Sequence, residues 1–155
     1  MTIREGNQED LEDALALIRE LAIFEKAPDA VENTIEDMIK DGFGERPVFE
    51  FFVAEVDGKV VGLALYYYNY STWKGRSLYL EDLIVKEDYR GRGIGKKLFE
   101  RVLLKAKEER VGRMDWQVLD WNTSAIDFYK KMGARLDDEW INCRLTKAQI
   151  QHFEG

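Results

Sequence analysis

Residues 79–110 read Y-L-E-D-L-I-V-K-E-D-Y-R-G-R-G-I-G-K-K-L-F-E-R-V-L-L-K-A-K-E-E-R, and this stretch decides the fold of the chain. Its first part, Tyr79–Val85, is rich in apolar, β-prone residues, which predicts a strand. After four polar residues and a glycine-rich turn, apolar residues recur at helical spacing. They are Ile94, Leu98, Val102 and Ala106, with Phe99 and Leu103 beside them. The stretch therefore predicts a strand that leads through a glycine-rich turn into a helix.

The composition of this turn suits an anionic ligand. A helix start carries unpaired backbone N–H groups and a partial positive charge, and glycines before it let the main chain come close to an anion. Arg90 and Arg92 add positive charge. A plain turn between strand and helix would explain the glycines alone equally well. Two common phosphate motifs do not fit, because the spacing is G-x-G-x-G, and a P-loop would need glycine at Arg90 and Ser or Thr at Lys97.

The spacing that does match is R-x-x-G-x-G, at Arg90, Gly93 and Gly95, which resembles the pyrophosphate loop of the GNAT acetyltransferases. A second segment of that family, N-x-x-A-x-x-F-Y-x-x-x-G, follows in the family's order. It stands here as Asn122, Ala125, Phe128, Tyr129 and Gly133. The resemblance implies an acetyl-CoA-dependent enzyme of the α/β class. Its fold would be a mixed, mostly antiparallel central sheet that splays between two central strands and is flanked by helices.

Three further segments resemble one branch of the family, the spermidine/spermine (diamine) acetyltransferases and their thialysine-acetylating relatives. They are Tyr66–Val85, Leu17–Glu25 and Asp41–Pro47, so the likeness covers nearly the whole chain. The stretch after Gly133, R-L-D-D-E-W, is shorter than in the animal polyamine enzymes, where this region helps to shape the amine pocket. The resemblance therefore implies a small amine substrate and leaves its identity open.

The composition of the chain limits the other classes of protein and of site that are possible. At 155 residues, with 45% hydrophobic and 34% charged residues, the chain is predicted to be a single globular domain, residues 1–155. A net charge of −7 argues against a nucleic-acid binder, including an R-G-R-G segment, and fits either a cationic partner or an ordinary acidic surface. Cys143 and His152 are the only residues of their kinds, which makes a disulfide, a zinc site or a nucleophile–histidine pair improbable. With no membrane-length apolar run and no signal-peptide pattern, we expect a cytoplasmic protein without a metal or a membrane partner.

The remaining elements are predicted from periodicity, caps and turns. We expect strands at Thr2–Arg4, Val48–Val56, Lys59–Tyr70, Tyr79–Val85, Met114–Leu119 and Trp140–Leu145. We expect helices after Asn7, from Asn33 or Thr34 to Lys40 with Gly42 as the stop, from Ile94, at Thr123–Met132, and as a turn at Lys147–Phe153. The strands around the Asp57-Gly58 hairpin should form an antiparallel meander, in the order β-α-α-β-β-β-α-β-α-β.

Acetyl transfer to an amine has three chemical needs. The ammonium must lose a proton, the oxyanion needs a hydrogen-bond donor, and the departing thiolate benefits from a proton. Glu81 and Asp82 are adjacent acids inside an apolar strand, and regular β geometry predicts that they point to opposite faces. The resemblance implies that Glu81 binds the amine and acts as the general base, directly or through water; solvated acids on an edge strand are the structural alternative.

The resemblance also implies that Tyr129 protonates the coenzyme A sulfur. A phenol can do so because its unperturbed pKa, about 10, keeps it protonated at neutral pH. The structural alternative is a core aromatic residue at helical spacing, a description that Phe128 fits better.

The resemblance implies acetyl-CoA contacts in the strand, in the glycine loop and in the second motif. These residues are Leu83, Ile84, Val85, Arg90, Gly91, Arg92, Gly93, Ile94, Gly95, Lys96, Asn122, Ser124, Ala125 and Tyr129. Backbone N–H groups at the strand would bind the thioester carbonyl and the pantetheine arm. Asn122 would also be explained as a helix cap alone.

For the amine, the resemblance implies a site made of acids and one aromatic residue. Its residues are Phe24, Glu25, Glu81, Asp82 and Glu139. Carboxylates along a groove would pair with the separated ammonium groups of a diamine, and an aromatic face can hold a cation. We interpret the tyrosine run Tyr66–Tyr70 as sheet packing and an interface, and with the apolar C-terminal strand it predicts a homodimer.

Three other functions remain open from the sequence. The acceptor could be a protein N-terminus or an antibiotic, although no wide peptide groove or extra acidic loop is evident. The chain could also be an acetyl-CoA-binding regulatory module without turnover, but the presence of both Glu81 and Tyr129 argues against that function.

Overall fold

The computed structural model describes residues 1–155, which form two compact units, 1–117 and 118–155. The first unit contains a five-stranded sheet in the order β1-β2-β3-β4-β5. The strands are β1 (Thr2–Glu5), β2 (Glu50–Val56), β3 (Lys59–Ser71), β4 (Gly75–Val85) and β5 (Arg113–Asp115). All neighbours pair antiparallel except β4 and β5, which are parallel. The predicted mixed, mostly antiparallel sheet is therefore confirmed.

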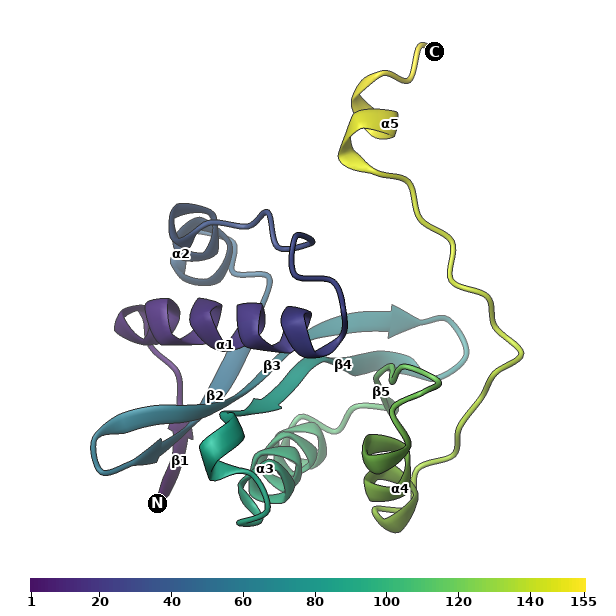
Figure 1. The fold of residues 1–155 in the computed structure, drawn as a ribbon. Helices are drawn as coiled ribbons and strands as arrows, with labels where there is room; N and C mark the ends of the chain where they lie inside the picture. The colour runs from purple at the N-terminus through teal and green to yellow at the C-terminus, as the bar shows by residue number, and fades with distance from the viewer. The chain divides into compact units, whose positions relative to one another are not determined.

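Helices cover both faces of this sheet (Figure 1). The helices α1 (Leu11–Phe24) and α2 (Ile35–Phe43) lie on one face, and α3 (Ile94–Glu108) lies on the other. No helix of the chain is long and apolar enough to cross a lipid bilayer.

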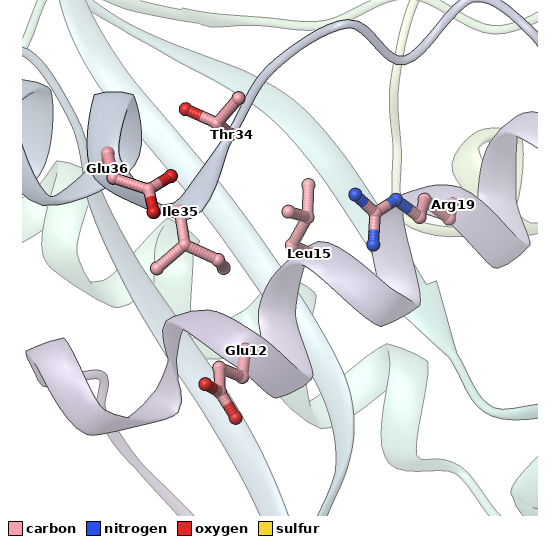
Figure 2. A pocket seen from close by; sticks show the side chains of 6 residues that line it. All are labelled: Glu12, Leu15, Arg19, Thr34, Ile35 and Glu36. Atoms are coloured by element: carbon pink, nitrogen blue, oxygen red, sulfur yellow. The ribbon is translucent and has the colours of Figure 1, made fainter.

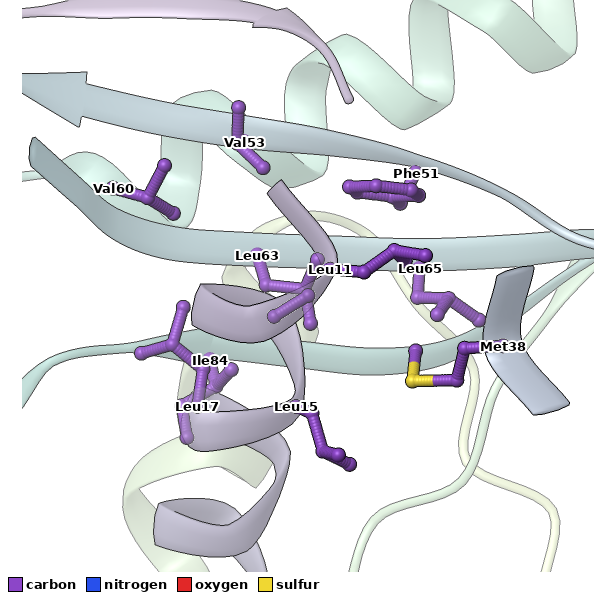
Figure 3. Packing of buried hydrophobic residues seen from close by; sticks show 11 residues of the cluster. Leu11, Leu15, Leu17, Met38, Phe51, Val53, Val60, Leu63, Leu65 and Ile84 are labelled. Atoms are coloured by element: carbon purple, nitrogen blue, oxygen red, sulfur yellow. The ribbon is translucent and has the colours of Figure 1, made fainter. Parts of the chain in front are cut away.

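The core on the α1 face joins the helices to alternate residues of the sheet (Figure 3). Its buried members are Leu11, Ala14, Leu15, Leu17, Met38, Phe51, Val53, Val60, Leu63, Leu65 and Ile84. The helix expected after Asn7 is confirmed as α1, and its buried residues Leu11, Ala14 and Leu15 lie on one face at helical spacing. This core fixes which residues of β3 and β4 face α1, and therefore fixes the face on which the candidate site lies.

Two predicted helix boundaries need correction. Asn7 forms a capping box with Asp10, but it caps a short 3-10 turn, η1 (Gln8–Asp10), that runs into α1. Gly42 does not end α2; the helix continues to Phe43, and Gly44 is its C-cap. A Cβ at Gly42 would lie 2.5 Å from the ring of Phe49, so a larger residue there would have to displace that ring.

Two predicted strands are wrong in part or entirely. The strand expected at Met114–Leu119 is β5, which ends at Asp115 after three paired residues. The strand expected at Trp140–Leu145 does not form, and residues 134–146 contain no helix or strand. Trp140 and Ile141 are 77% and 88% exposed. An apolar, alternating pattern makes a strand only where a partner supplies hydrogen bonds for its backbone, and this segment has no strand partner.

The second unit holds α4 (Thr123–Lys131) and α5 (Lys147–Gln151). Asn122 caps α4 as predicted, because its side-chain oxygen accepts the N–H of Ala125 at 3.2 Å. Gly133, with φ of +89°, follows the end of α4. The terminal helical turn is confirmed as α5, which Thr146 and Gln149 open with a capping box.

Candidate active site

The candidate site begins with an irregularity of the sheet at Glu81. The β3–β4 register runs Leu65 opposite Asp82 and then Tyr66 opposite Leu80, so Glu81 is an extra residue without an opposite partner. This is a β-bulge, a feature that redirects side chains and is common beside active sites. It corrects the expectation that Glu81 and Asp82 point to opposite faces. Residues that face each other across a ladder share a face, so Asp82 lies on the Leu65 face, which is the α1 face.

Glu81 also lies on the α1 face. The hydroxyl of Tyr67 donates a hydrogen bond to Glu81 Oε2 at 3.1 Å, and the Tyr67 ring stacks on that of Tyr79 at 5.3 Å. Tyr67 and Tyr79 are opposite each other in the ladder. The bulge thus places two adjacent carboxylates on one face, next to a pair of stacked phenols.

Burial and like charge act strongly on Asp82. Burial is the largest cause that raises its pKa from 3.8 to about 7, and the charges of Glu81 and Glu25 raise it further. Burial also raises the pKa of Glu25, which follows the C-terminus of α1. No ion pair includes any of these three acids, which we call the acid cluster (Glu25, Glu81 and Asp82). The acid cluster can therefore accept a cation that the protein itself does not provide.

The outer edge of β4 is open beside the acid cluster. The parallel ladder with β5 pairs only Ser77, Leu78 and Tyr79, so no strand pairs with that edge of β4 from Leu80 to Val85. β4 and β5 separate after Tyr79, but β5 is the edge strand of this sheet, so the splay between two central strands is found only as an early end of the β4–β5 pairing. Backbone groups of Leu83, Ile84 and Val85 lie along the open part of β4, whereas the Ile84 side chain belongs to the core.

The start of α3 has no side-chain cap. Gly93 is its N-cap residue, with φ of +76°, and the first turn has no acid. Gly91 also has a left-handed φ, +74°. At both glycines a Cβ would have no neighbour within 4 Å, so the space above the turn is open. The N–H groups of the first α3 turn therefore remain available to an anion, as the glycine motif predicts.

The two arginines of the turn are held by carbonyl groups. Arg90 Nε donates to Val85 O at 2.9 Å, and Arg92 Nη2 donates to Asp88 O at 3.0 Å. The Arg90 guanidinium also lies 5.4 Å from the ring centroid of Phe24. One arginine therefore links the end of β4, the glycine turn and the end of α1, and brings Phe24 near the predicted cofactor loop.

The other predicted site residues belong to the second unit. Asn122 is the α4 cap, Ser124 and Ala125 are in the first turn of that helix, and Glu139 is exposed. Tyr129 is buried with 9% exposure, and its ring lies 5.3 Å from that of Phe128, which is only partly buried. Phe128 was expected to be the more core-like of the two, and this expectation is wrong.

Two shallow depressions lie elsewhere in the first unit, between α1 and the start of α2. The first, of about 420 Å³, is lined by residues of α1 and of the start of α2, which Figure 2 labels. They are Glu12, Leu15, Arg19, Thr34, Ile35 and Glu36. The second, of about 400 Å³, adjoins it and shares Glu12 and Ile35. Neither depression contains a residue of the acid cluster or of the glycine turn.

Tyr67 is the residue near the site that the sequence did not single out. The predicted antiparallel meander pairs the strand of Tyr67 with that of Tyr79, and the structure places the two residues opposite each other. The bulge that turns Glu81 toward Tyr67 leaves no mark in the residue pattern. As for metals, no group of three or more His, Cys, Asp or Glu side chains is arranged to hold an ion.

Comparisons with known proteins point to one family and one fold. The sequence profile of the Acetyltransferase (GNAT) family matches residues 12–134. A thialysine N-epsilon-acetyltransferase from Bos taurus is 46% identical over 99% of this chain and 92% of its own length. The human spermidine/spermine N(1)-acetyltransferase-like protein 1 is 40% identical over 96% of this chain, which is 23% of that protein. Among solved structures, a possible acetyltransferase from Clostridium difficile 630 has a similar fold, with a TM-score of 0.79, 22% identity and coverage of 94% of this chain and 97% of that one.

Proposed function

The chain belongs to the GNAT family of acetyltransferases and is an amine acetyltransferase, and on that premise we propose that it transfers the acetyl group of acetyl-CoA to the primary amine of a small polyamine, a diamine or a thialysine-like amino acid. The observation that carries this proposal is the acid cluster on the α1 face, which has no cation of its own. A small molecule with ammonium groups supplies the missing positive charge. The names of the two relatives support the same class of acceptor.

The glycine turn and the start of α3 are proposed to hold the pyrophosphate. The open first turn of α3 supplies N–H donors, and Arg90 and Arg92 supply charge beside it. The open edge of β4 at Leu83–Val85 supplies backbone groups for the extended arm. When bound, acetyl-CoA supplies the acetyl group as a thioester whose thiolate leaves.

Two side chains are proposed to move protons. Glu81 accepts the proton of the substrate ammonium, directly or through one water, so that the amine nitrogen can form its bond to the acetyl carbon as the carbon–sulfur bond breaks. Tyr129 donates its phenolic proton to the departing sulfur. Glu25 and Asp82, with Phe24 and Glu139, bind the rest of the amine and orient it.

A panel of acceptors tests the proposed function. Purified protein with acetyl-CoA should release thiol when given putrescine, spermidine, spermine or thialysine, and much less with a peptide N-terminus or an aminoglycoside. Release with the peptide or aminoglycoside alone would contradict the small-amine proposal.

Two substitutions test the proton transfers. Glu81→Gln should lower turnover about a hundredfold, mostly at low pH, and free amine at high pH should rescue it in part. Tyr129→Phe should lower turnover without such rescue and should leave cofactor binding nearly intact, because only one hydroxyl is lost. Near-wild-type rates for both variants across the pH range would show that the roles are wrongly assigned.

The cofactor loop is best tested at Gly95. Gly93 has a left-handed φ, so a larger residue there would strain the backbone regardless of any ligand. A Cβ at Gly95 meets only Val85 Cγ2, at 3.7 Å, which is an ordinary contact. Gly95→Val should therefore fold normally but obstruct the pyrophosphate, and calorimetry should show a large loss of acetyl-CoA affinity. Unchanged affinity in the folded variant would remove the loop from the proposed site.

We also propose that the protein forms a homodimer. The aromatic end of β3 and the segment around Trp140 expose apolar surface, including Tyr70 at 75% exposure. Sedimentation at micromolar concentration should show a mass of about twice the 18.1 kDa of one chain. A single monomeric species would count against the dimer.

A further inference from the structure

We propose that Tyr67 is a positioning residue for Glu81, and this inference rests on the amine acetylation proposed above. The bulge removes Glu81 from the β3–β4 ladder, and its side chain is exposed. An exposed glutamate can adopt several rotamers, and only some of them aim the carboxylate at a bound amine. A residue that selects one rotamer therefore contributes to the rate without touching the substrate.

Tyr67 has the geometry for this role. Its hydroxyl donates to Glu81 Oε2 at 3.1 Å, which leaves Oε1 to accept a proton from the amine or from a bridging water. The ring of Tyr67 is itself held in place, because it stacks on Tyr79 with 5.3 Å between centroids and 29° between planes. The hydrogen bond thus connects the exposed Glu81 carboxylate to the stacked pair of Tyr67 and Tyr79.

The negative charges near Glu81 oppose the orientation that the hydrogen bond from Tyr67 favours. Asp82 lies beside Glu81 on the same face, and the charge of Glu25, which follows the end of α1, acts on Asp82. When these acids are ionised they repel one another, which favours rotamers that turn Glu81 outward. A hydrogen bond to the ionised carboxylate opposes this repulsion. Burial and the charge of Glu81 raise the pKa of Tyr67, so its hydroxyl keeps its proton and remains a donor at neutral and mildly alkaline pH.

Tyr67→Phe tests the inference, with Tyr79→Phe as the matched control. Both changes keep the stacked rings and remove one hydroxyl on the same face, but only the first removes the bond to Glu81. We expect Tyr67→Phe to lower kcat roughly tenfold, at the lower end of the range for a hydrogen bond to a charged group, and to leave the KM for acetyl-CoA unchanged. Tyr79→Phe should stay near the wild-type kcat. Equal losses in both variants, or none in Tyr67→Phe, would overturn the inference.

A double-mutant cycle separates this inference from the proposed function. If Tyr67 acts through Glu81, Tyr67→Phe should have no further effect on kcat in a Glu81→Gln background. A further tenfold loss in that background would show that Tyr67 acts independently of Glu81, and would overturn the inference alone. A slow Glu81→Gln beside a normal Tyr67→Phe would do the same. If Glu81→Gln retains full activity, the proposed base and the inference both fail.

Discussion

Two aspartates of the first unit, Asp10 and Asp82, are both at least partly buried, but the pKa of one is lowered and that of the other is raised. Asp10, whose side chain is 8% exposed, accepts hydrogen bonds from both terminal nitrogens of Arg4 at 2.8 Å and from the N–H of Asn7 at 2.8 Å. The pKa of Asp10 is lowered, and the hydrogen bonds from Arg4 are the largest cause. Asp82 has no cation beside it, and burial together with two other acids raises its pKa to about 7.

Asp10 is therefore an acid that stabilises the fold, whereas Asp82 is available to bind a cationic ligand. Arg4 of β1 and Asn7 of the capping box before α1 donate hydrogen bonds to Asp10, so its negative charge is balanced within the protein. The protein leaves Asp82 unpaired and surrounds it with like charge, at a cost in stability. Strongly perturbed acids of this second kind are concentrated at functional sites.

The largest expected effect is a gain in stability from Asp82→Asn. Between its ordinary pKa of 3.8 and about 7, Asp82 keeps a proton in the folded protein that it loses in the unfolded chain. Wild-type stability should therefore fall as the pH rises through this window. A neutral amide avoids the loss, so Asp82→Asn should be about 2 to 4 kcal/mol more stable than wild type at pH 8, and nearly equal to it at pH 4.

Chemical denaturation at both pH values measures this difference. Glu87→Gln, at an exposed acid that follows β4, is the control for loss of one negative charge and should change stability little. A less stable Asp82→Asn at pH 8 would mean that Asp82 has a partner in solution and that the contrast with Asp10 is false.

Asp10→Asn should have the opposite sign. The change removes one charge-assisted bond and leaves the Arg4 guanidinium without its best acceptor, which should cost about 2 kcal/mol at neutral pH. The pKa of Asp10 is lowered on folding, so the stability it contributes is present at neutral pH and is lost in acid, as the pH falls through the lowered pKa. The variant should thus approach wild type at low pH.

Asp13→Asn is the matched control for this prediction, because Asp13 is an exposed acid in the first turn of the same α1 helix. Its loss should change the midpoint of denaturation only slightly. Equal effects of the two changes would mean that the Arg4 contacts contribute little.

The third expected effect concerns the amine rather than the fold. Below pH 7 Asp82 is mostly neutral, so the site has less negative charge to offer an ammonium group. The KM for a diamine should rise roughly tenfold from pH 8 to pH 6, and Asp82→Asn should flatten this dependence. Initial rates at both pH values measure it. A pH dependence that persists in Asp82→Asn would assign the effect to another group.

Much of the fold could be predicted from local sequence. Helix α3 begins at Ile94 as expected, and the Asp57-Gly58 turn joins β2 to β3. These features depend on periodicity and turn chemistry, which neighbouring residues determine. The strand expected at Trp140–Leu145 does not form, because a strand needs a second strand to pair with. That second strand is distant in the sequence, so the periodicity of one segment cannot reveal it.

The candidate site was predictable in its residue types but not in its geometry. The glycine turn is at the start of α3 as expected, with left-handed glycines and no side-chain cap. The direction of Glu81 could not be predicted, because it depends on one extra residue in the β3–β4 register. Burial is the largest cause that raises the pKa of Asp82, and the charges of Glu81 and Glu25 add to it; both depend on tertiary packing, so the raised pKa could not be foreseen either.

The smallest expected effect concerns the second acid that pairs with Arg4. Glu55 Oε2 accepts a hydrogen bond from Arg4 Nε at 3.0 Å, but the two side chains are 34% and 33% exposed. Water screens an ion pair of this kind, and Arg4 keeps its two bonds to Asp10 when Glu55 is neutral. Glu55→Gln should therefore cost at most about 0.5 kcal/mol in denaturation at neutral pH. A loss as large as that of Asp10→Asn would mean that charge pairing with Arg4, rather than burial of the acceptor, sets the stability of this corner of the fold.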